Sequence, residues 1–438
     1  MNKTIERYYL KLQPLTPIHV GSGEEIMPYE YIIDKSVNKY YRINLNKLLD
    51  SLSAEDRAEF VDMLSGDLVK LRASIKNFQW KEAAVYSGDT GPQFRSDYLD
   101  KIDNADNKLA VEEIINSKMR PYIPGSSIKG AFRTAYLHHF AENVKYDVTR
   151  HRRYGFFQVK NDKEAERIEK RTLKYHKIKG DPFQTVKFSD SSLNIDKTKV
   201  YKMYSVHTKK DKKIPFYREA IAGLITSNVE QSIFLELSID KGRQNCKHKK
   251  NSIWHKISAE DLLESTRSFS EDLIEYELDY LTKNKAPREA AKTYESLKGI
   301  HSSLEDNESL IRFGKGCGFN STTLNLTNQG RSGTPITRVL AEGKFPVGWA
   351  VFSLSKEKYD VSILNNKELK NKSKEIEEKR KKDRKKKKKE YPNLKAYVKD
   401  KYGKKTATKV ARYKISKSKK KKEVYEKYKK EYEEFLNS

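Results

Sequence analysis

The sequence contains little cysteine and no long hydrophobic run, and each of these absences excludes a class of protein. Among its 438 residues are two cysteines, Cys246 and Cys317, which excludes a disulfide-stapled scaffold and fits a reducing compartment. No stretch of about 18 apolar residues occurs, and the N-terminal MNKTIERYYL has no apolar signal core. We therefore expect a cytoplasmic protein without membrane partners, with 36% hydrophobic residues to bury one sizeable core or two modest ones.

Positive charge, by contrast, is abundant and unevenly distributed. The chain carries 89 Lys and Arg against 61 Asp and Glu, and residues 366–438 alone hold 30 basic and 12 acidic side chains. Like charges at this density repel, so residues 366–438 are predicted to be a Lys-rich extension, disordered or helical rather than compact. This extension would be either a solvated solubility tail or an arm that binds polyanions with a steep salt dependence.

The rest of the chain has the periodicities of an α+β protein. Alternating apolar residues predict strands at residues 8–12, 186–188, 233–239 and 347–351. From Gly125 the apolar residues follow helical spacing, and Ser258 with Asp261 forms a capping-box signal before a second long helix. The order strand, helix, strand, strand, helix, strand is typical of the ferredoxin-like fold that RNA-recognition motifs also use, an antiparallel sheet with two helices on one face.

Residues 1–365 are expected to form one domain in which this core carries large insertions. Polar turn residues between two short apolar runs predict a hairpin near residues 29–43. Helical insertions are expected near residues 45–120, 145–180 and 258–310. Open sheet faces and loops of such cores hold single-stranded RNA in other proteins, but a fold does not fix a function.

The segment YIPGSSIKGAFR at the start of the main helix suits a phosphate. Its proline and glycine force a tight entry, and the first helical turn should present unpaired amides at the positive end of the helix dipole. Lys129 and Arg133, four residues apart and expected to be exposed, share one face near that end. The alternative is an ordinary serine N-cap with two solvated cations. The P-loop spacing is absent, so nucleotide hydrolysis is not implied.

A glycine-rich loop, FGKGCGFNSTTLN, covers residues 313–325. Gly314, Gly316 and Gly318 alternate with Lys315 and other larger residues, which would let the backbone approach a sugar-phosphate strand closely. A surface turn would need the same residues, so the loop alone is weak support for a ligand.

The loop LTPIHVGSG follows the first predicted strand and contains His19. A histidine beside the head of the main helix invites a general-base interpretation. The plainer interpretation is a loop histidine that donates a hydrogen bond, and it is favoured because no acid or nucleophile lies at a telling spacing.

Together these segments resemble the RAMP superfamily of CRISPR proteins. The resemblance rests on LTPIHVGSG, YIPGSSIKGAFRTA, KFSDSS, IPFYREAI and FGKGCGFNSTT, in this order, over most of residues 1–355. Within the superfamily, the PFYRE and GKGxGF segments together resemble the subunit that ends the backbone filament of type III-A (Csm) effector complexes, near the 3′ end of the CRISPR RNA. The Lys-rich extension departs from the usual pattern.

The resemblance implies an antiviral-defence protein that binds RNA, is not an enzyme, and uses no cofactor or metal. The implied partners are the CRISPR RNA (crRNA), the adjacent Csm backbone subunit and other Csm subunits, with a role in crRNA 3′-end maturation; a host nuclease is left open. The hairpin near 29–43 resembles a projecting thumb. Implied RNA contacts are His19, Gly21, Ser22, Gly125, Ser126, Ser127, Lys129, Arg133, Arg218, Gly314, Lys315, Gly316 and Gly318. Arg218 would be either an RNA contact or one half of an internal ion pair with Glu219, partly available to RNA.

The main rival is a metal-independent RAMP endoribonuclease that processes CRISPR RNA with a histidine. The candidate imidazoles are those of His19, His138, His139 and His151; His138 and His139 are adjacent on the main helix and cannot share a face. Weaker alternatives are metal sites. These are a divalent-metal site at Asp190, Asp196 and Glu219, and a zinc site at Cys246, His248 and His255 that lacks a fourth ligand.

Overall fold

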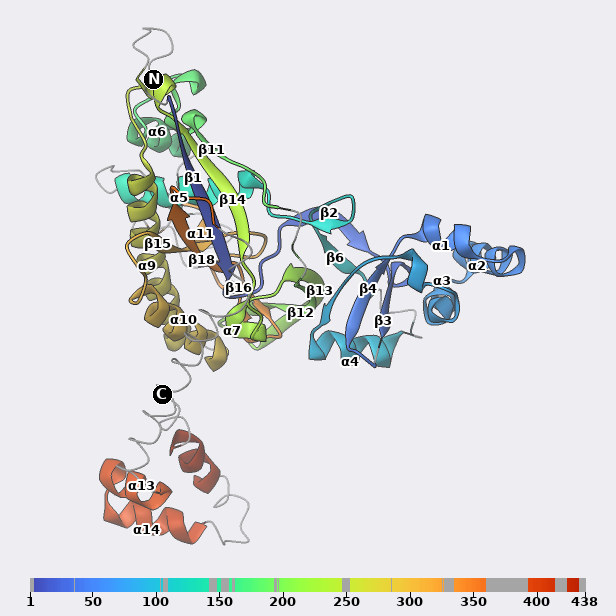
Figure 1. Cartoon of the computed structure of the whole chain (residues 1–438). Coiled ribbons are helices and arrows are strands. Elements are labelled where there is room, and N and C mark those ends of the chain that lie inside the picture. Colours follow the sequence, from blue (N-terminus) through green and yellow to red (C-terminus); the bar gives the residue numbers. More distant parts are fainter. Residues whose placement is uncertain are drawn as a thin grey trace. The chain divides into compact units, whose positions relative to one another are not determined.

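The protein is described from a computed structural model of the whole chain (Figure 1). The structure describes residues 4–34, 36–102, 104, 109–141, 148–150, 157–159, 162–192, 195, 197–245, 253–284, 286–324, 326, 335–359, 393–413 and 424–432. The chain divides into two compact units, Met1–Tyr359 and Asp360–Ser438. This division lies a few residues before the boundary at 365 that the charge distribution predicts.

The first unit contains a five-stranded sheet in which every neighbouring pair is antiparallel. From edge to edge the strands are β11 (Val186–Phe188), β14 (Ile233–Asp240), β1 (Ile5–Pro14), β18 (Trp349–Ser355) and β15 (Glu308–Arg312). Alternation along β1 buries Leu10 and Leu12 completely, whereas Tyr9 and Lys11 point to the other face and stay partly exposed. The sheet therefore has one face in the core and another that β1 and β14 leave partly open.

Three long helices accompany this sheet (Figure 1). They are α5 (Gly125–Phe140), α9 (Ala259–Lys283) and α10 (Arg288–His301). Helix α5 packs Phe132 against Phe352 of β18 on the core face. Helix α9 starts with the predicted capping box and then runs along the edge strand β15, where the Ser270 hydroxyl donates to the Leu310 carbonyl. None of the described helices combines the length and the apolar character that a membrane crossing requires.

Along the chain these elements follow as β1, α5, β11, β14, α9 and β18, each where the sequence predicts it. The fold is thus α+β, as expected. One detail differs from expectation: β15 is an additional edge strand, so α9 packs both beside α5 and along β15.

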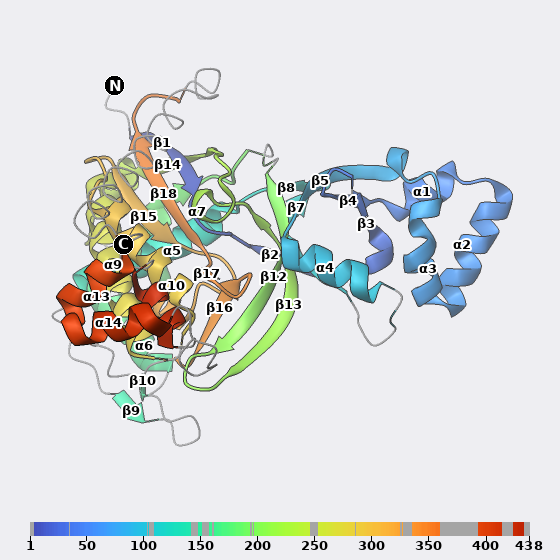
Figure 2. The same cartoon turned by 90° about the horizontal axis from the view of Figure 1, so that it is seen from below.

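A second, mixed sheet occupies the middle of the first unit, and the sequence analysis missed it (Figure 2). Its main path is β2 (Gly21–Ile26), β6 (Val111–Ile114), β13 (Lys212–Ile221), β12 (Thr198–His207), β5 (Ala84–Thr90), β4 (Lys39–Ile43) and β3 (Tyr31–Asp34). Strands β16 (Thr337–Ala341) and β17 (Phe345–Pro346) join it beside β12. The long hairpin of β12 and β13 escaped notice because its turn and the start of β13 are exposed and lysine-rich, without apolar alternation.

The predicted hairpin near residues 29–43 is present as β3 and β4. It does not project alone, because β4 also pairs with β5 and a small apolar core packs three helices against it. These helices are α1 (Leu45–Ser51), α2 (Ala54–Gly66) and α3 (Leu68–Ser74), and α4 (Pro92–Lys101) follows β5. The hairpin therefore forms one edge of the second sheet and carries helices of its own.

Shorter elements complete the first unit. The predicted insertion at 145–180 contains β9 (Val148–Arg150), β10 (Phe157–Val159) and α6 (Asp162–Thr172). Leu173 and Tyr175, just after α6, are buried in the main core and anchor this insertion. The remaining short elements are β7 (Asn116–Ser117), β8 (Arg120–Pro121), α7 (Leu224–Ser227), α8 (Lys241–Gln244) and α11 (Phe319–Thr322).

In the second unit the described residues are helical, which is one of the two predicted alternatives, and they pack together, which the charge density did not predict. Helices α13 (Leu394–Tyr402) and α14 (Lys404–Tyr413) and a helical segment at 424–432 enclose a small core. Its buried residues are Tyr397, Val398, Ala407, Val410 and Tyr432. Tyrosine rings supply much of the apolar area of this core, although the sequence around them is rich in charge. An ion pair adds to it, since Glu431 lies 2.8 Å from the Lys401 ammonium. The lysine runs at 380–390 and 417–422 lie outside the described residues.

Candidate nucleic-acid interface

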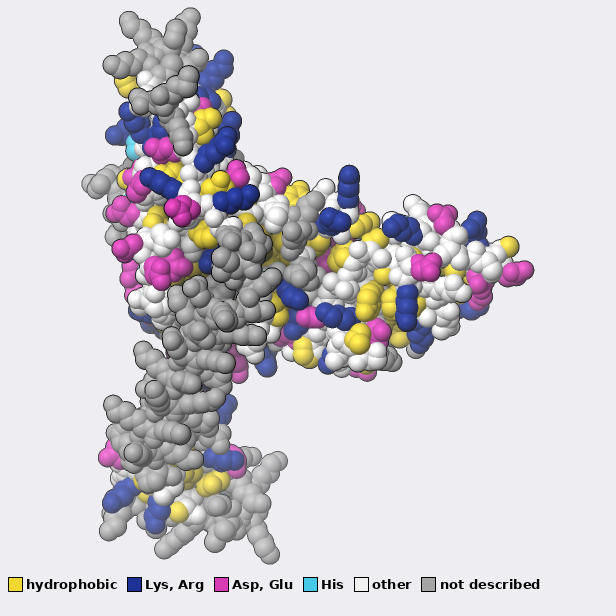
Figure 3. All heavy atoms as spheres, viewed as in Figure 1, with side chains coloured by type: hydrophobic (Ala, Val, Ile, Leu, Met, Phe, Trp, Pro, Cys, Tyr) yellow, Lys and Arg dark blue, Asp and Glu magenta, His cyan; other side chains and the backbone are white. Residues whose placement is uncertain are grey.

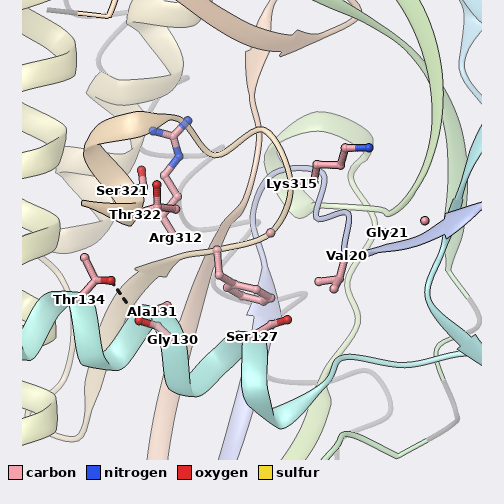
Figure 4. Close-up of a pocket in the computed structure, with 13 residues that line it drawn as sticks. Val20, Gly21, Ser127, Gly130, Ala131, Thr134, Arg312, Lys315, Ser321 and Thr322 are labelled. Atoms are coloured by element: carbon pink, nitrogen blue, oxygen red, sulfur yellow. Dashed lines mark hydrogen bonds between the residues drawn. The ribbon is translucent and has the colours of Figure 1, made fainter. Parts of the chain in front are cut away.

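The three loops that the sequence analysis singles out meet at one hollow of about 520 Å³ (Figure 4). Its lining comes from residues within 20–23, 127–134 and 312–322. Backbone hydrogen bonds hold the loops together: the Lys315 amide donates to the His19 carbonyl at 2.7 Å, and the Gly348 amide donates to the Pro17 carbonyl at 2.9 Å. The helix start and the glycine-rich loop, distant in sequence, therefore face one another.

One wall of the hollow is a face of α5 made of small residues. Ser127, Gly130, Ala131 and Thr134 recur at helical spacing and line the hollow, with Ser321 and Thr322 facing them from α11 (Figure 4). Because these side chains are short, a ligand could reach the helix backbone closely. Of this face, Ser127 alone is among the predicted contacts, although the spacing of the small residues could have revealed the others.

Lys129 and Arg133 lie on a different face of α5 and do not line the hollow. The expectation that both are exposed is wrong, because both are half-buried. Arg133 contacts two carboxylates of the 145–180 insertion and the segment after it, Glu169 at 2.5 Å and Asp181 at 3.0 Å. Its role is thus to fasten that insertion to α5. Burial lowers the pKa of Lys129, although the nearby Asp181 acts to raise it.

The start of α5 also differs from both sequence-based interpretations. Pro124 is the N-cap residue and no serine caps the helix; Ser126 is exposed and Ser127 faces the hollow. The Gly125 amide is not unpaired but donates to the Asp190 carboxylate at 2.8 Å. A carboxylate thus already complements the positive end of the helix dipole. A phosphate would be better accommodated along the side of α5 than at its tip.

The glycines of the loop after β15 are required by its backbone path. Gly314, Gly316 and Gly318 all have positive φ, at 96°, 91° and 93°. A Cβ on Gly314 would also lie 2.6 Å from the carbonyl oxygen of His19. The loop is therefore held tightly against the loop of His19, with Gly318 opening the short helix α11.

Lys315 is the cation of this loop, and its side chain is 57% exposed at the hollow. Its ammonium lies 2.7 Å from Glu112, a residue of β6 that the sequence analysis missed. The same Glu112 oxygen accepts from Arg218 at 2.7 and 2.9 Å. Partial burial would raise the pKa of Glu112, but the hydrogen bond from Lys315 and the charge of Arg218 together hold it below its ordinary value. The carboxylate is thus a permanent anion between two cations.

Arg218 and Glu219 do not form an ion pair, so that prediction is wrong. They are neighbours on β13 and point to opposite faces of the sheet, as alternation along a strand requires. Arg218 is 3% exposed and bonds Glu112 and the Lys315 carbonyl, so it is not available to a ligand at the surface. Glu219 is fully buried and accepts from the Tyr86 hydroxyl at 2.9 Å.

His19 is a buried structural residue, 2% exposed. Its Nδ1 lies 2.6 Å from the Glu219 carbonyl oxygen and must donate to it, which leaves Nε2 as the basic nitrogen. Burial and then the charge of Arg218 lower the pKa of His19 to about 3. Such a group is a poor general base near neutral pH. Gly21 packs directly on the ring, because a Cβ there would lie 2.9 Å from Nε2.

The chain matches the model of a known protein family. The model of the RAMP superfamily matches residues 11–438. The chain belongs to the RAMP superfamily. Curated RAMP relatives include a protein named "CRISPR system Cms protein Csm5" from Methanocaldococcus jannaschii, 28% identical over 330 residues, which is 72% of this chain and 72% of the relative. A protein of the same name from Streptococcus thermophilus is 27% identical over 51% of this chain and 63% of its own length.

Two solved structures have a similar fold. One chain of a Csm–crRNA–target RNA ternary complex of a type III-A CRISPR-Cas system, determined by cryo-electron microscopy, matches with a TM-score of 0.54. It is 19% identical, and the match covers 80% of this chain and all of that one. The crystal structure of Csm5 from T. onnurineus matches with a TM-score of 0.52 at 16% identity, over 78% of this chain and 99% of that one. At these identities the likeness concerns the fold.

The alternative sites predicted from sequence find little support in the described part of this RAMP chain. No group of three or more His, Cys, Asp or Glu among the described residues is arranged to hold a metal ion. On α5, His138 bonds Asp272 of α9 at 2.8 Å and His139 lies 4.0 Å from Glu264, away from the hollow. The remaining candidates, His151, Asp196, Cys246 and His248, lie outside the described residues.

Ser22 completes the predicted RAMP loop residues. It lies at the bulge of β2, where its hydroxyl accepts from the Glu24 amide at 3.1 Å. The next residue, Gly23, lines the hollow and has a φ of 100°. The hydroxyl of Ser22 thus shapes the turn, and Gly23 offers backbone to a ligand.

The buried Glu219 makes the stability of this RAMP fold depend on pH. Burial raises its pKa from an ordinary value of 4.5 to about 7. Between these values the folded chain binds more protons than the unfolded chain, so stability falls as pH rises from 4.5 to 7. We expect Glu219→Gln to increase the free energy of unfolding at pH 8 by roughly 3 kcal/mol more than at pH 5.

Urea unfolding at the two pH values, followed by circular dichroism, measures this difference. Glu295→Gln, at an exposed position of α10, is the matched control and should shift both values equally. The same change for Glu219→Gln at pH 5 and pH 8 would contradict the prediction. His19 titrates in the parent chain and in the Glu219→Gln variant alike, so its contribution to the difference in stability between them cancels.

Proposed function

We propose that this protein is a non-catalytic, crRNA-binding subunit of a type III-A Csm effector complex in the cytoplasm. It would cap the backbone filament near the crRNA 3′ end and support maturation of that end. The observation that carries the proposal is the hollow at which a small-residue helix face, a glycine-rich loop and the exposed Lys315 converge. An open hollow with accessible backbone and one exposed cation suits a sugar-phosphate chain read without regard to sequence.

We infer that the five-stranded sheet is a ferredoxin-like RAMP core. Its strand order β11, β14, β1, β18, with α5 and α9 as the connections, is the order expected for strand, helix, strand, strand, helix, strand. The insertions and the second sheet would then be additions to this core within residues 1–365, and 366–438 a basic extension of separate role.

The predicted contact residues take different parts in this proposal. Gly21, Ser127, Gly314 and Lys315 line the hollow and would touch the RNA backbone. The others would act indirectly or at the margin: Gly125, Gly316 and Gly318 shape the loops, Ser22, His19 and Arg218 support them, and Ser126, Lys129 and Arg133 lie on the outer faces of α5.

The proposed partners are taken from the proteins to which this chain is similar. The matched chain in the ternary complex comes from an assembly with crRNA and target RNA, and the curated relatives are named Csm5. By this likeness the partners would be crRNA, the adjacent Csm backbone subunit and other Csm subunits. A host nuclease recruited for 3′-end trimming would be a further partner, because the low pKa of His19 argues against cleavage by this chain itself.

Replacing Lys315 tests the proposed contact. Lys315→Gln is expected to weaken binding of single-stranded RNA about 10-fold and to reduce the salt slope of binding by about 1, since one phosphate contact is lost and Glu112 keeps only one of its two cations, Arg218. Filter binding at several salt concentrations measures both quantities, and sequencing the RNA that copurifies with the complex identifies the ligand.

Lys298→Gln is the matched control for this experiment. Lys298 on α10 is 53% exposed and pairs with Glu275 at 2.9 Å, much as Lys315 pairs with Glu112. It should leave RNA binding unchanged. The proposal fails if both variants bind RNA like the parent chain, or if the purified parent chain cleaves RNA in a way that His19→Ala abolishes.

A further inference from the structure

The outward face of the five-stranded sheet carries aromatic rings on its two central strands. Tyr9 of β1 and Phe234 of β14 point away from the core, because their neighbours in sequence are buried in it. Phe234 lies opposite Lys11 in the register, and Tyr9 lies opposite Glu236. The two rings are thus diagonal neighbours on adjacent strands, and both are half-exposed.

A third ring joins them from the segment after β18. The Tyr359 ring lies 5.7 Å from that of Phe234, and the Lys11 ammonium lies 5.7 Å from the Tyr359 ring centre. The Tyr359 hydroxyl donates to the Ser353 carbonyl at 3.1 Å, which fixes the ring over the sheet. The rings therefore have defined positions although water reaches them.

Basic side chains surround these rings. Arg7 and Lys11 of β1 and Lys187 of β11 occupy outward positions, as the register with β14 requires. Of the carboxylates on this face, Asp240 and Glu308 accept hydrogen bonds within the chain, and Glu236 lies beside Tyr9. Over β1 and β14, Figure 3, drawn in the same view as Figure 1, shows basic and hydrophobic side chains next to one another, with acidic side chains among them.

We propose that this face is a second RNA-binding surface, on which unpaired bases stack on Tyr9, Phe234 and Tyr359 while Arg7, Lys11 and Lys187 contact the phosphates. It is separate from the hollow, because α5 lies against the opposite face of the sheet. The inference rests on the proposed function, since it assumes that the ligand is RNA.

The spacing of the side chains favours RNA over a protein partner. A protein interface of useful strength has a contiguous, charge-depleted apolar core, whereas here rings alternate with serines and charges along each strand. Every base presents a ring face and every nucleotide a phosphate, which this alternation of rings and cations matches. Stacking of this kind does not depend on the base, so the surface should accept many sequences.

The test uses the full-length chain and a 30-nucleotide single-stranded RNA that contains 4-thiouridine. Tyr9→Leu combined with Phe234→Leu keeps apolar bulk but removes two stacking faces, and about a 10-fold loss of affinity per ring is expected. The salt slope should stay unchanged, because no charge is lost. Lys11→Gln should instead reduce the salt slope by about 1. Tyr41→Leu, a half-exposed ring on β4, is the control and should change neither quantity.

Photo-crosslinking of the unmodified chain is independent of any folding defect in the variants. Crosslinks at Tyr9, Phe234 or Tyr359 support the inference, and their absence overturns it. If the ring variants bind RNA normally while Lys315→Gln does not, the inference falls and the proposed function stands. If the ring variants keep RNA but no longer join the purified complex, the face binds protein and the inference also falls. A full-length chain that binds no RNA overturns both.

Discussion

Gly125→Ala is expected to lower the free energy of unfolding by about 3 kcal/mol and to abolish RNA binding at the hollow. A Cβ at this position would lie 2.3 Å from the carbonyl oxygen of Phe188 and 2.5 Å from that of Ser189. Both are backbone atoms, and β11 cannot move away from α5 because it is hydrogen-bonded to β14. The start of α5 would have to move instead, which breaks the hydrogen bond from Gly125 to Asp190 and displaces one wall of the hollow.

Gly130→Ala is the matched control on the same helix. A Cβ on Gly130 meets nothing within 4 Å, and glycine in a helix interior costs stability relative to alanine. This variant should therefore gain about 0.5–1 kcal/mol. Urea unfolding of both variants measures the contrast, and a similar effect at the two positions would refute the packing argument.

Gly130→Asp is expected to weaken RNA binding about 100-fold, because a like charge facing phosphates across a confined surface costs several kcal/mol. The new carboxylate would project into the hollow beside Ser127 and Thr134, into space that no other group fills. Folding should suffer little, since the position is open to solvent. Fluorescence anisotropy with labelled single-stranded RNA measures the loss.

Gly299→Asp controls for net charge and helix propensity. Gly299 lies in α10, and a Cβ there also meets nothing within 4 Å, but it is not part of the hollow. RNA affinity should change little in this variant. Equal loss in both variants would mean that overall charge, and not the hollow, governs RNA binding.

The parts of the fold that could be predicted are those whose burial repeats regularly along the chain. Alternation in β1 and β14, helical spacing in α5 and the capping box of α9 each specify an element without reference to distant residues. The second sheet could not be predicted in this way. Its strands pair across long separations, as β5 does with β12, and the start of β13 is exposed and lysine-rich.

In the candidate site, too, the local features could be predicted and the long-range ones could not. The three loops were found because glycine, proline and serine reveal tight turns locally. Whether a cation is free to bind a ligand could not be predicted, because this depends on carboxylates that other elements place beside it. Glu169 and Asp181 form ion pairs with Arg133, and Glu112 forms one with Arg218. Glu112 itself sits in a short strand whose sequence gives no sign of its neighbours. A basic residue in the sequence therefore does not by itself indicate a cation that is available to a ligand.

The carboxylate of Glu112 has one more consequence for Lys315. The ammonium already has a counter-ion at 2.7 Å, so RNA arriving there does not meet a bare cation but trades places with a carboxylate. Such an exchange yields less net attraction than contact with an unpaired ammonium would, so a lone monovalent anion gains little from it. A polymer binds more strongly, because its other contacts keep the incoming phosphate at a high local concentration. The arrangement thus selects for chain length over charge alone.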